Sequence, residues 1–314
     1  MMKNFLIEQY KKDKKMKISH NYLSQQFFDF NKIFKKFKKV IKFNDFTLGS
    51  EVNLFEKNIR KLFNQKYVAA VGSGTDALML SLKSLGVKEG DEIITTPYTF
   101  YATIGAIVTL GAKPIFVDIQ EDYNIDPTLI EKAITKKTKA IMPVHLLGNP
   151  CKIDVIKKIA KKHNLFLIED GADSSGAEYH GKKIGSWGDL STYSFFFTHI
   201  MSTIEGGMVN TNNPHLAELL KSKRSFGWIR DLKNKKKYEK MYSNIDPRFL
   251  FISRGFNFKP TEIQGAFGIH QIKKLDSFVE ARRKNANFWT KELKKYNKSF
   301  LTIAEQPNTK SAWY

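Results

Sequence analysis

The side chains of this sequence that are best suited to chemistry lie between residues 165 and 211, where acidic, hydroxyl and imidazole groups follow short apolar runs. The run at 165–168 is wholly apolar, as is typical of a buried parallel strand, and Asp170 follows closely after it. A neighbouring strand-like run leads to Ser194 and His199. Ligands of open α/β sheets bind at the carboxyl ends of strands. We therefore expect these three side chains to meet in one pocket.

A glycine-rich turn at residues 72–77, with the sequence GSGTDA, lies between an expected strand and an expected helix. Backbone N–H groups and the helix dipole at such a place hold a phosphate. The turn also fits the loose dinucleotide pattern G-x-G-x-x-A, but the next strand should then end on an acid, and the run 92–96 is followed by Pro97. A phosphate cradle is the favoured interpretation, with a plain tight turn as the alternative.

Two residues have an ordinary structural interpretation when each is taken alone. Phe100 would be a core residue, and Asp170 would be a helix N-cap after a buried strand. Together with the glycine-rich turn and Ser194, however, they are the groups needed to hold pyridoxal phosphate. A carboxylate keeps the pyridine nitrogen of that cofactor protonated, so that the ring can withdraw electrons.

Length and charge limit the classes of protein to consider. The chain has 314 residues, of which 42% are hydrophobic and 13% aromatic, as in a soluble protein with one large domain and a smaller part. The net charge of +21 could indicate a nucleic-acid partner, but the lysines are spread along the chain. In residues 31–42 they form the wet face of an amphipathic helix. We expect no nucleic acid as partner, and a positive field that attracts a phosphate-bearing substrate.

The sequence predicts a cytoplasmic protein without a membrane partner. No apolar run approaches the roughly 20 residues that span a bilayer, and the lysine-rich residues 1–17 contain no apolar segment of the signal-peptide type. The single cysteine, Cys151, excludes an intrachain disulfide and a four-cysteine zinc or iron-sulfur site within this chain. His145, His163 and His180 lack metal-ligand spacing, so we expect them to be structural or surface residues and predict no metal site.

These functional groups must be positioned by a mostly parallel sheet with helices on both faces, because short apolar strands alternate with helical patterns. The expected strands are 67–71, 92–96, 113–117, 140–144 and 165–168, and the helices between them are 75–85, 100–110, 127–135 and 153–163. Beyond Pro214 we expect a helix to residue 224, a lysine-rich loop at 231–240, and helices at 261–275 and 277–296. The predicted domains are a leader with an amphipathic helix (1–45), a large α/β domain (46–260) and helices leading into an incomplete small domain (261–314).

From about residue 46 onward the sequence resembles the DegT/StrS-type family of sugar aminotransferases, which are fold type I pyridoxal-phosphate enzymes acting on nucleotide-linked keto-sugars. The resemblance rests on the motifs at 72–78 (GSGTDAL), 98–100 (YTF), 144–150 (VHLLGNP), 169–170 (ED), 185–189 (GSWGD), 194–195 (SF), 205–207 (EGG) and 255–257 (GFN). It implies that Gly74, Thr75 and Ser194 bind the cofactor phosphate, Phe100 stacks on its ring and Asp170 pairs with the ring nitrogen. It also implies a homodimer, in which Asn257 reaches the phosphate of the neighbouring subunit's cofactor.

The chain departs from this family at the position of the lysine that bonds to the cofactor, four residues after the phenylalanine of the Ser-Phe motif, where it has His199. An imidazole cannot form that covalent bond. This histidine, the LGNP run at 147–150 and Asp173, which we assign to cofactor binding, are similar to the 3-dehydratase branch of the family, typified by the GDP-4-keto-6-deoxymannose 3-dehydratases. The resemblance implies pyridoxal or pyridoxamine 5′-phosphate held without a covalent bond. His199 would be the base in loss of the C3 hydroxyl from a nucleotide-diphosphate-linked 4-keto-6-deoxy sugar.

Other members of that branch carry an iron-sulfur cluster on four cysteines, and a chain with one cysteine resembles the cluster-free type. Two other functions stay open at this point. The chain could be an aminotransferase of nucleotide-linked keto-sugars, or a family member that binds without catalysis. The resemblance further implies a role in polysaccharide or O-antigen synthesis.

Overall fold

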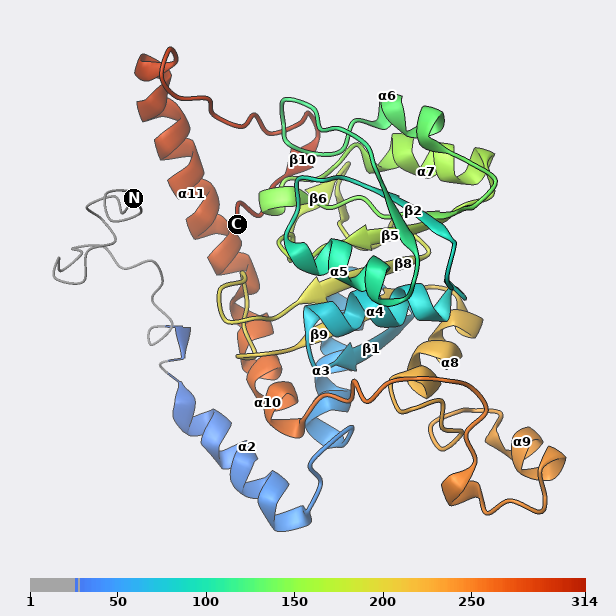
Figure 1. The fold of residues 1–314 in the computed structure, drawn as a ribbon. Coiled ribbons are helices and arrows are strands. Elements are labelled where there is room, and N and C mark those ends of the chain that lie inside the picture. Colours follow the sequence, from blue (N-terminus) through green and yellow to red (C-terminus); the bar gives the residue numbers. More distant parts are fainter. Residues whose placement is uncertain (1–25, 28) are drawn as a thin grey trace, which may run out of the picture.

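The computed structural model describes residues 26–27 and 29–314, so the polar leader expected up to about residue 20 lies outside the described residues. A seven-stranded sheet with the order β1-β9-β8-β5-β4-β2-β3 forms the centre of the molecule (Figure 1). Its strands are β1 (Tyr67–Val71), β2 (Glu92–Thr95), β3 (Lys113–Phe116), β4 (Thr138–Ile141), β5 (Phe166–Asp170), β8 (Leu190–Ser194) and β9 (Gly207–Thr211). Within this sheet β9 runs antiparallel to both neighbours and the other pairings are parallel.

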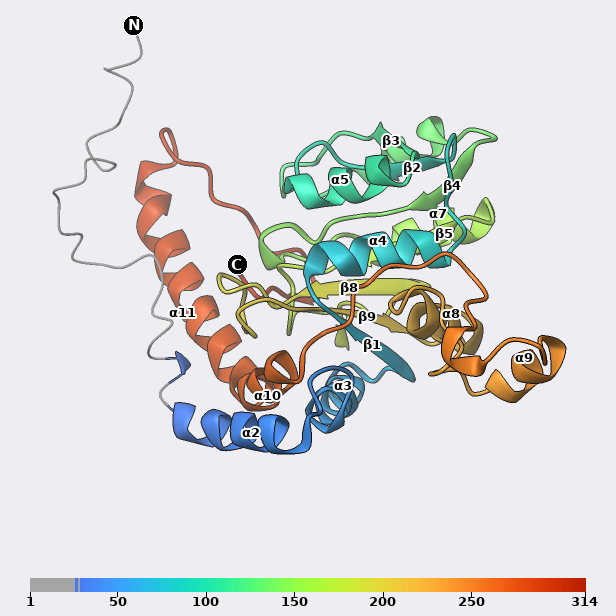
Figure 2. The ribbon, with the colours of Figure 1, turned by 60° about the horizontal axis from the view of Figure 1, so that its bottom comes forward.

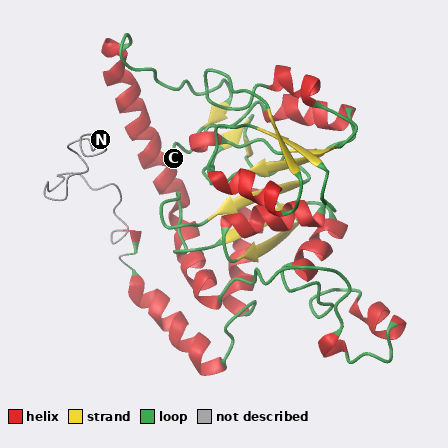
Figure 3. Ribbon diagram, in the orientation of Figure 1, coloured by secondary structure: helices red, strands yellow, loops and turns green. Residues whose placement is uncertain are grey.

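Helices cover both faces of this sheet (Figure 3). They are α2 (Phe30–Phe43), α3 (Ser50–Phe63), α4 (Gly74–Ser84), α5 (Tyr101–Thr109), α6 (Pro127–Ile130), α7 (Ile153–Lys162), α8 (Pro214–Lys223), α9 (Lys235–Met241), α10 (Glu262–Gln271) and α11 (Leu275–Leu293). The predicted fold class, a mostly parallel sheet between helical layers, is confirmed.

The core has two main parts because neighbouring residues of each strand point to opposite faces of the sheet. In β2, Ile93 belongs to the apolar cluster that includes residues of α4, α5 and α8, whereas Ile94 belongs to the one that includes residues of α3 and α7. In β5, Ile168 lies on the first of these faces and Leu167 on the second. Strands buried on both faces read as continuous apolar runs, which is why they were visible in the sequence.

Three expectations for individual helices were incomplete. The lysine-rich segment 231–240 was expected to be a loop, yet it contains most of α9. The helix expected over 127–135 is α6 followed by a short 3₁₀ turn, Glu131–Ala133. In α2 the lysine face is present, but Phe34 and Ile41 of the opposite face are exposed while Ile33 and Val40 are buried.

The end of the chain returns to the main body of the fold. Strand β10 (Thr309–Lys310) pairs with β6 (Glu178–Tyr179), which pairs with β7 (Lys182–Lys183) in a small second sheet. Beyond β10, the Ala312 amide donates to the Gly148 carbonyl at 3.0 Å and the Tyr314 amide donates to the Leu147 carbonyl at 2.8 Å. The C-terminal residue therefore lies between α11 and the main sheet (Figure 2). No helix in the described part of the chain is long and apolar enough to cross a membrane.

Candidate active site

A cavity of about 410 Å³ opens at the carboxyl ends of β5 and β8, beside the N-termini of α4 and α5. Seven of the eight predicted site residues line it: Gly74, Thr75, Phe100, Asp170, Asp173, Ser194 and His199. Residues 165 to 211 thus contribute four of these groups, and the glycine-rich turn and the start of α5 supply the others.

The N-terminus of α4 forms a cradle for an anion. Ser73 caps this helix, since its Oγ accepts from the Asp76 amide at 3.1 Å. The amides of Gly74 and Thr75 have no acceptor among the described residues, so they are free to bind a phosphate with the help of the helix dipole. A Cβ on Gly74 would lie 2.5 Å from the Cβ of Ser194, so the absence of a side chain lets the end of β8 approach the cradle.

Gln264, on the first turn of α10, supports this cradle, although no sequence motif indicated a role for it. Its Nε2 donates to the Gly72 carbonyl at 3.0 Å and to the Glu205 carbonyl at 2.8 Å. The same side chain forms a capping box with Thr261, which fixes it at the helix start. Gln264 is 192 residues from Gly72 and 59 residues from Glu205 along the chain. The start of α10 therefore holds both the glycine-rich turn and the loop before β9 in place.

Asp170 ends β5 and is only 3% exposed. Its Oδ2 accepts from the Thr103 hydroxyl at 2.9 Å and its Oδ1 accepts from the Ala172 amide at 3.3 Å. Burial raises the pKa of this carboxyl, and the two hydrogen bonds offset only part of the effect. A cation placed in the cavity against Asp170 would relieve that penalty.

The neighbouring Glu169 points to the other side of β5 and has a structural role. Its carboxylate accepts from the amides of Gly185, Trp187 and Gly188 at 2.7–2.8 Å, which shapes the loop before β8. His145 lies 3.3 Å from the same carboxylate. Burial raises the pKa of Glu169, but His145 and the amides outweigh it, so the net shift is downward.

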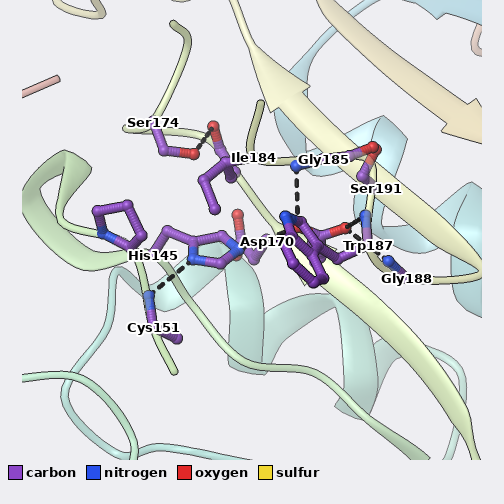
Figure 4. Close-up of polar contacts among 12 residues, drawn as sticks. His145, Cys151, Asp170, Ser174, Ile184, Gly185, Trp187, Gly188 and Ser191 are labelled. Carbon is purple, nitrogen blue, oxygen red and sulfur yellow. Dashed lines mark hydrogen bonds and ion pairs between the residues drawn. The ribbon is translucent and has the colours of Figure 1, made fainter. Parts of the chain in front are cut away.

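Figure 4 shows this network around the sharp turn that carries the Gly-Ser-Trp-Gly motif. His145 Nδ1 accepts from the Cys151 amide at 3.0 Å, which leaves its Nε2–H to donate to Glu169. The expectation that His145 is structural agrees with this fully buried position. Among the described residues, no group of three His, Cys, Asp or Glu side chains is arranged to hold a metal ion.

Phe100 stands at the mouth of the cavity, immediately before α5, and is 81% exposed. The alternative that it is a core residue is therefore wrong. An exposed ring beside a phosphate cradle is available to stack on a flat ligand.

His199 contacts an acid and an aromatic ring. Its Nδ1 lies 3.3 Å from Asp173 Oδ1, within ion-pair distance, although the two groups are not aligned for a hydrogen bond. The ring of Tyr314 packs 5.2 Å from the imidazole, and the Tyr314 hydroxyl is 2.8 Å from the Thr198 hydroxyl. Asp173, which was expected to bind the cofactor, thus lies against His199.

Glu205 also lines the cavity. Burial raises the pKa of this carboxyl, and the nearby His199 partly opposes the shift. The sequence showed Glu205 within a motif but suggested no role for it. Thr103 lies one helical turn after Phe100, so the sequence could have indicated that its side chain faces the cavity. Nothing in the sequence indicated a role for Tyr314.

Asn257 is the one predicted site residue outside the cavity. It is exposed, and its side-chain oxygen accepts from the Lys259 ammonium. Its neighbour Phe258 accepts at its carbonyl from the Gly72 amide at 3.0 Å, so this segment runs along the outer side of the glycine-rich turn.

Known proteins are similar to this chain in sequence and in fold. Residues 29–314 match the DegT/DnrJ/EryC1/StrS aminotransferase family, which is nearly the whole of the described chain. The chain belongs to this family. The predicted resemblance is thereby confirmed, as is its direction toward the dehydratases, since these are among its similar members.

Three DegT/StrS family members illustrate the range of similarity. GDP-4-keto-6-deoxy-D-mannose 3-dehydratase of Yersinia pseudotuberculosis is 37% identical over 88% of this chain and 72% of its own length. GDP-perosamine synthase of Caulobacter vibrioides is 37% identical over 79% of this chain and 63% of its own length. The Escherichia coli 3-dehydratase, solved with bound hydrated PLP, superposes with a TM-score of 0.78 and 34% identity, covering 90% of this chain and 74% of that one.

Proposed function

We propose that the cavity binds pyridoxal or pyridoxamine 5′-phosphate. The groups that line the cavity fit this cofactor: free amides at the start of α4 for its phosphate, an exposed ring at Phe100 for its pyridine face, and the buried carboxylate of Asp170 for its ring nitrogen. The similar Escherichia coli structure, with its bound PLP, supports the proposal. When bound, the cofactor supplies an electron sink for bond cleavage next to a carbonyl carbon.

We further propose that the reaction is loss of the C3 hydroxyl from a nucleotide-diphosphate-linked 4-keto-6-deoxy sugar. One observation carries this proposal: among the described residues, no lysine lines the cavity, and His199 lines it four residues after Phe195, where the resemblance places the lysine. An enzyme that anchors its cofactor through a lysine needs that side chain in contact with it. The similarity to GDP-4-keto-6-deoxy-D-mannose 3-dehydratases supports the same substrate class.

In this reaction the residues that line the cavity would have separate roles. Asp173, close to His199 Nδ1, favours the tautomer with the proton on Nδ1 and leaves Nε2 as the base. Nε2 accepts a proton and can return it to the leaving hydroxyl as general acid. Tyr314 packs on the imidazole and limits its rotation. Asp170 and the cradle at Gly74 would hold the cofactor in the cavity that His199 also lines.

An aminotransferase of nucleotide-linked keto-sugars is the second candidate, because the chain is also 37% identical to a GDP-perosamine synthase, over a shorter part of its length than to the dehydratase. It would require a lysine from outside the described cavity. A family member that binds the cofactor without catalysis is the third. All three candidates share the cofactor. They differ in whether a lysine of the protein bonds covalently to it and in whether the sugar loses its C3 hydroxyl, gains an amino group or is unchanged.

The active unit we propose is a homodimer in the cytoplasm. Asn257 is exposed and outside the cavity of its own chain, which supports a contact with the cofactor phosphate of a second subunit. The cytoplasmic location rests on the sequence alone, and membrane and soluble fractions probed for the protein would test it. The expected pathway is the synthesis of a polysaccharide such as an O-antigen.

Reduction with borohydride tests the central point. The purified chain, loaded with pyridoxal phosphate and reduced, should carry no cofactor adduct in the mass spectrum, and the cofactor should dialyse away. His199→Lys, treated in the same way, should gain the mass of one reduced cofactor and serves as the positive control. An adduct on any lysine of the unaltered chain would contradict the dehydratase proposal and favour the aminotransferase.

A further inference from the structure

Asp170 is reached by a short chain of two hydroxyl groups at the start of α5. The Thr103 hydroxyl lies 2.9 Å from Asp170 Oδ2, and the Thr99 hydroxyl lies 2.8 Å from that of Thr103. Thr103 is 2% exposed, so its hydroxyl is shielded from bulk water, while Thr99 lines the cavity. Thr99 precedes the extended N-cap residue Phe100 and Thr103 lies in the first turn of α5, so the bend of the chain into the helix brings the two hydroxyls together.

The chain of hydroxyls has a direction. A hydroxyl carries one proton, and an ionised carboxylate can only accept. Thr103 therefore donates to Asp170, and its own oxygen accepts from Thr99. The hydrogen bond from Thr99 polarises the Thr103 hydroxyl, and this strengthens the hydrogen bond that Thr103 donates to Asp170.

The surroundings of Asp170 otherwise disfavour its charge. Burial has the largest effect on its pKa and raises it, and the negative charge of Asp173 acts in the same direction. Three groups act in the opposite direction: Thr103, the Ala172 amide and, at longer range, His145. Glu169, the next acid along β5, points away into its own network of amides. Thr103 is thus the side chain that most favours the carboxylate form.

We infer that Thr103, oriented by Thr99, is a positioning residue that keeps Asp170 ionised in its buried place and so keeps the shared proton on the ring nitrogen of a bound pyridoxal or pyridoxamine phosphate. Without the hydroxyl the proton would move toward Asp170, and a neutral pyridine beside a neutral acid is a weaker electron sink. This inference rests on the proposed cofactor site.

The first test uses the protein without cofactor. Thr103→Val removes the hydroxyl at nearly constant volume, and Thr103→Ser keeps it. The Asp170 carboxyl can be titrated by carbon-13 NMR and assigned by its loss in Asp170→Asn. Loss of a hydrogen bond to a charged group should raise the titration midpoint by about one pH unit in Thr103→Val, with Thr103→Ser close to the unaltered protein. Equal midpoints in all three proteins would overturn the inference.

The second test adds pyridoxal 5′-phosphate. Thr103→Val should bind it about 10-fold more weakly, and the absorbance of the bound cofactor should shift toward the form with an unprotonated ring nitrogen. Thr99→Val should give a smaller shift in the same direction, and Thr103→Ser should behave as the unaltered chain. A normal spectrum in Thr103→Val would overturn the inference even if binding is weaker. If the unaltered chain binds no cofactor while the midpoint still moves, the proposed cofactor site fails and the effect of Thr103 on Asp170 stands.

Discussion

At the scale of single residues, we propose that the choice of reaction depends on His199. Lysine and histidine are both bases, but only a primary amine can bond covalently to the cofactor aldehyde. An imidazole held near Asp173 can still move a proton, and the closeness of Asp173 Oδ1 to Nδ1 directs the free nitrogen elsewhere. The difference between a dehydratase and an aminotransferase in this fold is therefore expected to reside in one side chain.

We expect His199→Asn to bind the cofactor as the unaltered chain does, because Asn fills a similar space and the cradle and Asp170 are untouched. Loss of a general base should slow C3 deoxygenation by about 10²- to 10⁴-fold. Single-turnover assays with a GDP-linked 4-keto-6-deoxy sugar would measure the rate. Deoxygenation at the normal rate would exclude His199 as the base.

Asp170→Asn should separate cofactor affinity from the stability of the apoprotein. Burial raises the pKa of Asp170, so its charge destabilises the folded apoprotein as the pH rises through the unfolded and then the folded pKa. At pH 8 the neutral Asn variant should therefore unfold at a temperature no lower than the unaltered apoprotein. Its affinity for pyridoxal phosphate should fall about 10-fold or more, because a charge-assisted contact is lost. Calorimetry and equilibrium dialysis measure the two effects, and an unchanged affinity would remove Asp170 from the site.

At the scale of elements, β5 shows how one strand serves both the site and the fold. Because side chains alternate along a strand, Asp170 faces the cavity while Glu169 faces the loop before β8. Glu169 receives three backbone amides that would otherwise be buried without partners. The Glu-Asp pair of the sequence is therefore one acid that faces the cavity beside one structural acid.

Glu169→Gln should lower stability without changing the site chemistry directly. An amide side chain has one acceptor oxygen for three donors, so we expect a loss of about 2 kcal/mol in the free energy of unfolding at neutral pH. The pKa of Glu169 is lowered in the fold, so its contribution is complete above its ordinary pKa of 4.5 and is lost as the pH falls through the folded value. Denaturant unfolding from pH 7 to pH 3 should show the two proteins converging in acid.

The matched control is Glu131→Gln. Glu131 pairs with Lys162 and His163 at the surface, where ion pairs contribute little. It should unfold like the unaltered chain at neutral pH. A Glu169 variant as stable as this control would refute the structural role assigned to the network.

At the scale of the whole molecule, the site is assembled from segments far apart along the chain. Tyr314 reaches it because β10 pairs with β6 and the last residues bond to the loop at 147–148. Gln264 reaches it through the start of α10. Phe100 and Asn257 are both exposed, one at the mouth of the cavity and the other beside the glycine-rich turn.

We expect the protein to sediment as a homodimer, with each cavity completed by Asn257 of the other subunit. Asn257→Ala should then lower cofactor affinity although the residue is outside its own cavity, whereas Asn297→Ala, also exposed, should have no effect. Analytical ultracentrifugation and cofactor titration together check this. A monomer with full cofactor affinity would contradict it.

The sequence by itself determined the alternation of strands and helices and the place of the site. Apolar runs and the residues directly after them are local features, so the strands could be placed to within a few residues, as for the strand expected at 140–144 and found at Thr138–Ile141. Gly74, Asp170, Ser194 and His199 all lie at the end of such a strand or within five residues after it. The sequence could not show that Asp173 lies against His199. Both residues are in loops, and the path of a loop depends on the segments that pack against it.

Only the tertiary structure decided which distant residues complete the site. The contacts of Tyr314 with Thr198 and of Gln264 with Gly72 join positions 116 and 192 residues apart, and no periodicity records such a pairing. The exposure of Phe34 on α2 was likewise not predictable, since an amphipathic pattern indicates which side of a helix is apolar but not how much of that side its neighbours cover. Residues that follow a strand can be located from the sequence because the signal is local. The residues that close the cavity come from distant segments, and only the packing of those segments brings them together.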